Sequence, residues 1–159
     1  MMKYNFHKNT RQSGFTLIEV LVTLVIIAVG LLGLANVQLI GLKNNQSAYQ
    51  RSQATIAIYD MVERIRSNAS EIDNYVATAI EVKAATKVAT CTTATGCSTA
   101  EMAATDLAEW NELLTQSFGM AEGAIMPDGS IYNITITWDE NHDGVIDSND
   151  PTFPLSFRP

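Results

Sequence analysis

The chain has 159 residues, two cysteines and a formal net charge of −7 at pH 7, which allows one compact domain of modest core beside a membrane helix. Acidity is concentrated late, because the stretch from Glu101 onward holds eleven Asp or Glu residues and one basic residue, Arg158. This balance argues against nucleic-acid binding through a basic patch and favours cations or basic partners.

The first predicted element is an apolar helix over residues 15–35. Its only charged residue is Glu19, and a helix of this length, roughly 31 Å, spans the hydrocarbon core of a bilayer. Lys3, Lys8 and Arg11 precede the run, so the positive-inside rule keeps the first residues cytoplasmic. Because no second long apolar run follows, the sequence predicts a single-pass protein whose remaining residues are exported.

A cleavable secretory signal is the alternative explanation of this run. In such a signal the small-residue cleavage site follows the apolar stretch, where Gly33 and Ala35 stand here. The conspicuous glycine at the switch from polar to apolar sequence, Gly14, instead precedes the stretch. This order favours a retained helix.

The segment GFTLIEVLVTLVIIAVGLLGLA, residues 14–35, resembles the N terminus of type IV prepilins, a family of major pilins, minor pilins and type II secretion pseudopilins. The resemblance implies that residues 1–14 are a leader, that a prepilin peptidase cleaves between Gly14 and Phe15, and that Phe15 is N-methylated. It also implies insertion in the inner membrane with a periplasmic C-terminal domain. Assembly with other major and minor pilins would then bring the chain to the pilus and the cell surface.

Glu19 places a carboxylate inside the apolar run, where a charge is costly. The resemblance implies that it meets the amine of Phe15 on a neighbouring subunit and sets the docking register of the filament. Pairing with a cation removes most of the cost of an isolated carboxylate in hydrocarbon, which is several kcal/mol. The alternative is a side chain that only snorkels to the headgroups.

The helix is predicted to continue over residues 36–67 as an amphipathic segment, followed by a connecting region over residues 68–121. No proline interrupts residues 15–67, and apolar residues recur at three-and-four spacing, namely Ala54, Ile58, Met61 or Val62, and Ile65. The helix should stop within residues 68–74. A stretch rich in Thr, Ala and Ser then leads to Ser98.

Cys91 and Cys97 lie in this stretch, separated by five residues. In an oxidising compartment the pair predicts a disulfide, because no further His or Cys offers a metal site. A redox CxxC motif would need two intervening residues. For so short a loop the entropy model gives about 2 kcal/mol of stabilisation.

Ser98 and Glu101 have the spacing of a capping box. Leu107, Trp110, Leu113 and Leu114 follow at helical intervals, which predicts a second helix that ends near Gly119. We expect Trp110 to anchor the core.

Residues 122–159 are predicted to form a small antiparallel sheet with an acidic loop. Apolar residues alternate in two stretches, comprising Tyr132, Ile134, Ile136 and Trp138 in one and Phe153, Leu155 and Phe157 in the other. Pro127, Asp128 and Gly129 predict a turn that pairs a short strand, residues 124–126, with the first stretch. The expected fold is α+β and type IV pilin-like, with a long N-terminal helix packed on this sheet.

LAEWNELL, YNITITWDE and VGLLGLA also resemble segments of the type IV pilus modification protein PilV family. This second resemblance covers short segments only. It implies a minor pilin rather than a major subunit.

The acidic loop, DENHDGVIDSND, has the spacing of an EF-hand calcium loop with Gly144 at position six. His142 occupies a slot that provides no ligand. Position twelve is Asp rather than a bidentate Glu, so we expect weak Ca²⁺ affinity, roughly micromolar to millimolar. The alternative is a solvated acidic turn. The predicted ligands are Asp139, Asn141, Asp143, Val145 through its carbonyl, Asp147 and Asp150.

Nothing in the sequence indicates an enzyme, because the only histidines, His7 and His142, leave no support for a nucleophilic triad. The leading interpretation is a minor type IV pilin that joins or primes the pilus and supports biogenesis, adhesion and twitching motility. One alternative is a type II secretion pseudopilin. Another is a calcium-dependent adhesion module that the helix tethers to the membrane.

Overall fold

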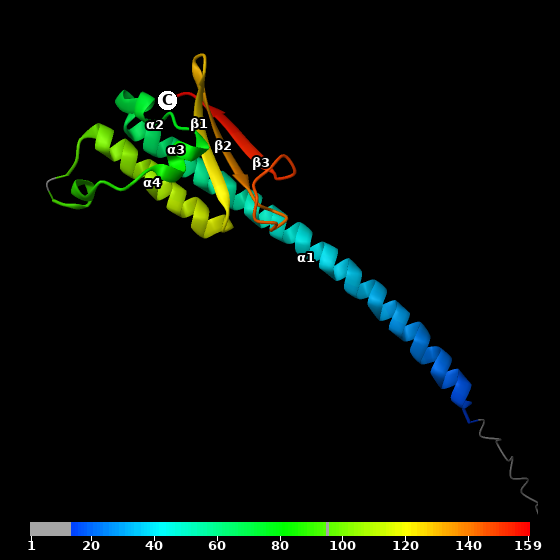
Figure 1. Ribbon diagram of the computed structural model, residues 1–159. Coiled ribbons are helices and arrows are strands. Elements are labelled where there is room, and N and C mark those ends of the chain that lie inside the picture. Colours follow the sequence, from blue (N-terminus) through cyan, green and yellow to red (C-terminus); the bar gives the residue numbers. More distant parts are fainter. Residues whose placement is uncertain (1–13, 95) are drawn as a thin grey trace, which may run out of the picture. The chain divides into compact units, whose positions relative to one another are not determined.

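The computed structural model describes residues 14–94 and 96–159 (Figure 1). Contacts divide the chain between Asn44 and Asn45 into two compact units. The helices of the described residues, including two 3₁₀ helices, are α1 (Leu17–Ser67), η1 (Ala69–Glu71), α2 (Ile72–Tyr75), α3 (Ala79–Ala84), η2 (Ala89–Thr92) and α4 (Thr99–Phe118). The strands are β1 (Ala121–Asp128), β2 (Ile131–Trp138) and β3 (Thr152–Phe157).

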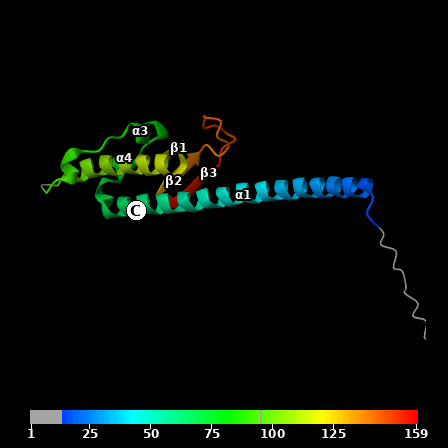
Figure 2. The ribbon, with the colours of Figure 1, turned by 90° about the horizontal axis from the view of Figure 1, so that it is seen from below.

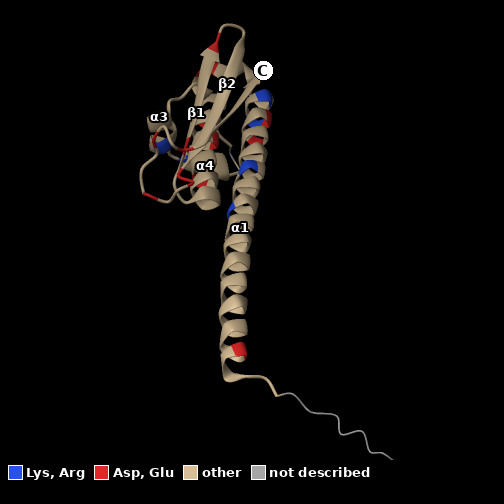
Figure 3. Cartoon of the chain, turned by 90° about the vertical axis from the view of Figure 1, so that its right-hand side faces the viewer, with Lys and Arg blue, Asp and Glu red and all other residues tan. Residues whose placement is uncertain are grey.

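Helix α1 begins at Leu17, two residues later than predicted, and ends at Ser67 as the periodicity indicated. Its first part is exposed and apolar, and Figure 3 shows a single acidic position there and no basic one. It is the one helix of the described residues long and apolar enough to cross a membrane. The predicted core positions of the second part, Ala54, Ile58, Met61, Val62 and Ile65, are all buried.

The second part of α1 lies beside α4 in both views of Figures 1 and 2. Trp110 of α4 is 1 % exposed, and its indole Nε1 donates a hydrogen bond of 3.0 Å to the carbonyl oxygen of Ala57 in α1. The prediction of Trp110 as a core anchor is therefore confirmed. The inner side chains of the sheet complete the same core, with Ile125, Ile134, Ile136 and Phe157 among them.

The three strands form an antiparallel sheet in the order β1-β2-β3. Strands β2 and β3 match the predicted alternation, because Ile134, Ile136 and Trp138 of β2 are all 0 % exposed and every second residue of β3, beginning with Thr152, is exposed. The predicted turn was misplaced. Strand β1 includes Pro127 and Asp128, and Asp128 pairs with Ile131, so the chain reverses at residues 129–130, where Gly129 has φ 61°.

Strand β1 is also longer than the three residues expected, because Gly123 lets it pass close to α4. A Cβ atom at Gly123 would overlap the Trp110 ring and lie 2.8 Å from Cδ1 of Leu114. The edge of β1 that does not pair with β2 is covered in part, since Ala77 and Ile125 exchange two backbone hydrogen bonds. Backbone hydrogen bonds therefore hold β1 along both of its edges.

The connecting region holds more helix than the one element expected there. Besides α4, it contains η1, α2, α3 and η2. Helix α3 is short but begins with a capping box, in which the hydroxyl of Thr78 accepts from the Glu81 amide and the Glu81 carboxylate accepts from the Thr78 amide. Predicted helix α4 has the expected box at Ser98 and Glu101 and ends before Gly119, which has φ 77°.

Candidate functional site

The predicted processing site lies where the described chain begins. Gly14 and Phe15 precede α1 outside any helix or strand, and Phe15 is 84 % exposed. Residues 1–13 of the predicted leader lie outside the described residues. A peptidase that cleaves at residue 14 would therefore meet an exposed bond, and the new amine would stand directly before the helix.

Glu19 lies in the first turn of α1, where its charge is favoured by the positive end of the helix dipole. Its backbone amide donates to the hydroxyl of Thr16 over 3.3 Å, so Thr16 caps the helix. Within the described residues no cation pairs with the Glu19 carboxylate.

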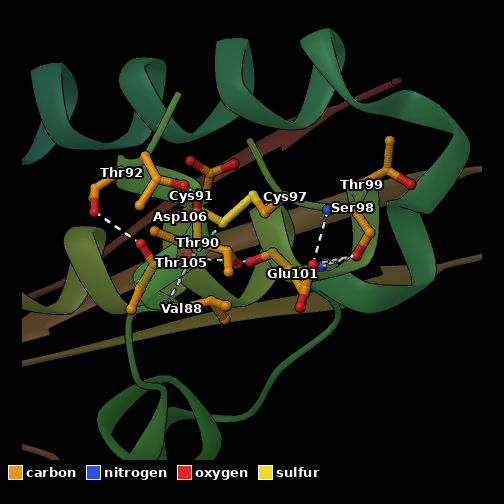
Figure 4. The surroundings of a disulfide bond; sticks show 12 residues. Val88, Thr90, Cys91, Thr92, Cys97, Ser98, Thr99, Glu101, Thr105 and Asp106 are labelled. Carbon is orange, nitrogen blue, oxygen red and sulfur yellow. Dashed lines mark hydrogen bonds between the residues drawn. A yellow bond between two sulfur atoms is a disulfide. The ribbon is translucent and has the colours of Figure 1, made fainter. Parts of the chain in front are cut away.

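The two cysteines form the predicted disulfide, Cys91 to Cys97 (Figure 4). The bond joins η2 to the residue just before the Ser98 cap of α4. Thr105 of α4 contributes to the junction, because its hydroxyl accepts from the Val88 amide over 3.1 Å and donates to the carbonyl of Glu101 over 2.9 Å, with Cys91 Sγ 3.3 Å away. The disulfide thus holds an otherwise weakly packed segment against α4.

A charged cluster that the sequence did not predict joins α1 to α4. The guanidinium of Arg64 donates to Asp60 over 2.9 Å and to Asp106 and Glu109 over 2.8 Å each. The hydroxyl of Tyr75 donates to the other oxygen of Asp106 over 2.6 Å. Only the Asp60 and Arg64 pair, at i and i+4, had a signal in the sequence. The two α4 partners stand more than forty residues away.

The cluster shifts the proton affinity of two of its members. Burial by itself lowers the pKa of Arg64, but hydrogen bonds to Glu109, Asp106 and Asp60 together outweigh that effect and raise it. For Tyr75, burial has the opposite effect and raises the pKa, and the hydrogen bond to Asp106 raises it further. The Arg64 guanidinium and the Tyr75 hydroxyl therefore keep their protons over any physiological pH.

The predicted calcium loop is organised by its two end residues. Asp139 and Asp150 are 5 % and 8 % exposed. The Asp139 carboxylate accepts from the amides of His142, Asp143 and Gly144 over 2.6, 3.3 and 2.9 Å. That of Asp150 accepts from the amides of Glu140 and Asp147 over 3.2 and 3.0 Å.

The intermediate ligands of the prediction lie on the exposed part of the loop. Asn141, Asp143 and Asp147 each accept the amide two residues further along, over 2.8 to 2.9 Å, and Val145 is 58 % exposed. Among residues 14–94 and 96–159 no three His, Cys, Asp or Glu side chains are grouped so that they could hold a metal. Ca²⁺ binding therefore stays a prediction.

A long apolar helix that continues into a small α+β head, where it packs on a three-stranded antiparallel sheet, defines the type IV pilin fold. Residues 36–108 match the family described as Type IV pilin Tt1218, and residues 9–35 match the prokaryotic N-terminal methylation motif. No curated protein and no solved structure matches the chain significantly. The two matches adjoin, and with the fold they support a type IV pilin that carries an N-terminal methylation motif.

The similarity to type IV pilins has general consequences. Type IV pilins are structural proteins, and the family implies processing by a prepilin peptidase and assembly with other pilins. The apolar helix and the methylation motif together indicate membrane anchoring. No match tests the resemblance to PilV, which stays a prediction.

Proposed function

We propose that this chain is a minor type IV pilin, cleaved between Gly14 and Phe15, methylated at Phe15, and incorporated in or priming the pilus. The observation that carries the proposal is the first part of α1. It follows Gly14 almost directly, it is exposed and apolar, and Glu19 is its only charged residue. Such a surface needs lipid before assembly and protein afterwards, which is the life cycle of a pilin subunit.

Processing is tested with two glycine variants of the full chain. Gly14→Val leaves the chain uncleaved in the membrane, whereas Gly33→Val, at the site that a secretory signal would use, is cleaved normally. Size on a denaturing gel and N-terminal mass spectrometry report both outcomes. Cleavage that responds to residue 33 and not to residue 14 would indicate a secretory signal and overturn the proposal.

Glu19 is proposed to pair with the Phe15 amine of a neighbouring subunit. The support is a carboxylate in the first turn of α1 that no cation of the described residues neutralises. Glu19→Ala is therefore inserted and cleaved like the wild type but is lost from sheared filaments. If the side chain only snorkels to the headgroups, the variant assembles at wild-type levels.

The minor role, and its separation from a pseudopilus, is tested in a deletion strain. Piliation, twitching motility, adhesion and type II secretion are scored separately, with the tagged chain restored. A minor pilin restores piliation and twitching. Loss of secretion alone would identify a pseudopilin, and a chain that stays in the membrane fraction with normal piliation would identify a tethered adhesion module.

We infer further that the loop of residues 139–150 binds Ca²⁺ weakly. Its carboxylates pair with no Lys or Arg in the described part of the chain, and the Oε1 atom of Glu140 is buried without a hydrogen-bond partner there. Gly144, at φ 84°, provides the sharp turn that a loop of hard oxygen ligands requires. Asp139 and Asp150 would hold the ion at the base, with Asn141, Asp143, Val145 and Asp147 completing its shell.

Calcium binding is tested by calorimetry and thermal unfolding of the full chain in detergent. Millimolar CaCl2 is expected to raise the Tm of the wild type and of the control Asp128→Asn, whose carboxylate lies outside the loop. Asp143→Asn, an exposed loop position, is expected to reduce the rise. An absence of heat and of any Tm change in the wild type would refute calcium binding.

A further inference from the structure

Strand β3, red in Figure 1, is an edge strand of the sheet. It pairs with β2 along one side. Among the residues that the structure describes, no backbone hydrogen bond from another segment reaches its other side, which we call the open edge. An open edge usually offers unpaired amides and carbonyls to any strand that approaches, and it is a common route to unwanted association.

The hydrogen bonds of β1 show which backbone groups face the open edge. Ile125 bonds Ala77 on the side away from β2, so its pair with Ile134 of β2 is not a hydrogen-bonded one. Because bonded and non-bonded pairs alternate in antiparallel strands, and the groups of successive residues point to opposite sides, Ile134 must bond β3. Its partner there is Leu155. The backbone groups of Leu155 therefore face β2, and those of the residues before and after it face the open edge.

Pro154 thus stands in the middle of the open edge. Thr152 and Ser156, two residues to either side of it, also point their backbone groups outward, and all three residues are exposed. Proline lacks the N–H group, and its ring occupies the place of that hydrogen. The ring therefore fills the open edge, whereas the ladder between β2 and β3 loses no hydrogen bond.

The other edge of the sheet follows the same rule. Pro127 lies two residues after Ile125 in β1, so its nitrogen also points away from β2. Between them, Pro127 and the bridge to Ala77 limit the access of a strand to this edge. A proline at Met126 or at Leu155 would instead have removed a hydrogen bond from the sheet. Each proline within a strand therefore stands where it blocks an edge and leaves the sheet intact.

We propose that Pro154 closes the open edge to strand addition by a second copy of this chain. Two identical edges would pair antiparallel about a two-fold axis, with Thr152 opposite Ser156 and the two copies of Pro154 opposite each other. The prolines remove the central hydrogen bonds of such a pair and place two rings between the strands. The head is thereby kept from association through its sheet. This conclusion does not depend on whether the chain enters a pilus.

The test removes the proline and then restores one at the same edge. Pro154→Val gives the open edge its missing N–H, and valine favours a strand. The double variant Pro154→Val with Ser156→Pro returns a proline to an outward-facing position. Pro151→Val is the matched control, because residue 151 precedes β3. Sedimentation equilibrium of the full chain in detergent measures self-association, and α1 is identical in every variant.

We expect self-association of Pro154→Val to be at least about tenfold tighter than that of the wild type, because the central hydrogen bonds can now form. The double variant and the control are expected to stay within about twofold of the wild type. Self-association of Pro154→Val at wild-type strength would overturn the proposal. Equal strengthening in the double variant or in Pro151→Val would also overturn it, because the effect would then not depend on the open edge.

Hydrogen exchange identifies the surface that associates. The amides of Thr152 and Ser156 are expected to exchange freely in the wild type and in Pro151→Val, because they face the open edge. In associated Pro154→Val they are expected to be protected. Association of this variant without protection of the two amides would place the contact elsewhere and refute strand addition.

Discussion

Replacement of Arg64 by alanine tests the charged cluster that joins α1 to α4. Three carboxylates converge on this one cation, so its removal leaves them to repel one another. Asp106 is the least exposed of the three carboxylates, with a side chain that is 13 % exposed. Without Arg64 it would keep only the Tyr75 hydroxyl as a partner among the described residues. The cost is therefore concentrated on a single partly desolvated carboxylate.

The magnitude follows from the exposure of each pair. Loss of one partner of a fully buried pair costs about 3–5 kcal/mol, whereas exposed pairs contribute about 0.2–1 kcal/mol. Arg64 is 31 % exposed, and Asp60 and Glu109 are 42 % and 36 % exposed, so their pairs belong to the weaker class. We expect Arg64→Ala to lower the free energy of unfolding by about 2–3 kcal/mol.

The assay is thermal unfolding of the full chain in detergent, followed by fluorescence of the buried Trp110 and Trp138. For a folded unit of the size of Asn45–Pro159, this loss corresponds to a Tm decrease of roughly 8–12 °C. Arg66→Ala is the control, because its pair with Glu63 is 49 % and 68 % exposed and should cost less than about 1 kcal/mol. Equal Tm values for the two variants would refute the assignment of the cluster as a structural joint.

Three further predictions concern the fold of the head. Gly123→Ala is expected to destabilise the unit by about 1–3 kcal/mol in urea unfolding, because its Cβ overlaps Trp110; unchanged stability would show that the ring moves freely. Reduction of the disulfide is expected to cost about 2 kcal/mol and to expose residues 88–98 to proteolysis before α4; identical cleavage of both redox forms would contradict this. Ser98→Ala is expected to cost about 1 kcal/mol and to reduce one acid-sensitive contribution, because alanine keeps the backbone amide that bonds the Glu101 carboxylate but loses the hydroxyl. Hydrogen bonds from the backbone and then the side chain of Ser98 lower the pKa of Glu101, so this contribution is present above the unfolded pKa of about 4.3 and is lost as the pH falls through the folded value. A wild-type response of Ser98→Ala between neutral and acidic pH would disprove it.

The sequence was sufficient where a local pattern determines the structure. The 3.6-residue period of apolar residues predicts α1 and its buried face, and the capping box predicts the start of α4. The alternation of apolar and polar residues predicts β2 and β3. These signals are carried by residues close together in the chain. Tertiary contacts therefore confirm rather than override them.

Strand β1 and the charged cluster could not be predicted, because both depend on contacts between residues that are far apart in the chain. Glu122 and Gly123 have little preference for a strand, and their conformation follows from pairing with β2 and from the space beside Trp110. Pro127 and Asp128 are typical of turns, but an edge strand tolerates proline. The partners of Arg64 on α4 become its neighbours only when the two helices pack together.

In the candidate site, too, local spacing was predictable and tertiary contacts were not. Spacing alone identified Cys91 and Cys97 as a pair, and the disulfide is present. The sequence also identified Asp139 and Asp150 as the two ends of a loop, but not that they would be nearly buried and bonded to backbone amides. Burial of this kind depends on where the flanking strands leave the sheet.

The central claim, that the chain is a processed type IV pilin, is tested most directly by mass spectrometry of the protein recovered from sheared surface filaments. The account predicts an N-terminal peptide that begins with N-methylated Phe15 and continues with Thr16. A chain that still begins at Met1, a chain cut after Ala35, or the absence of the protein from the filaments would contradict it.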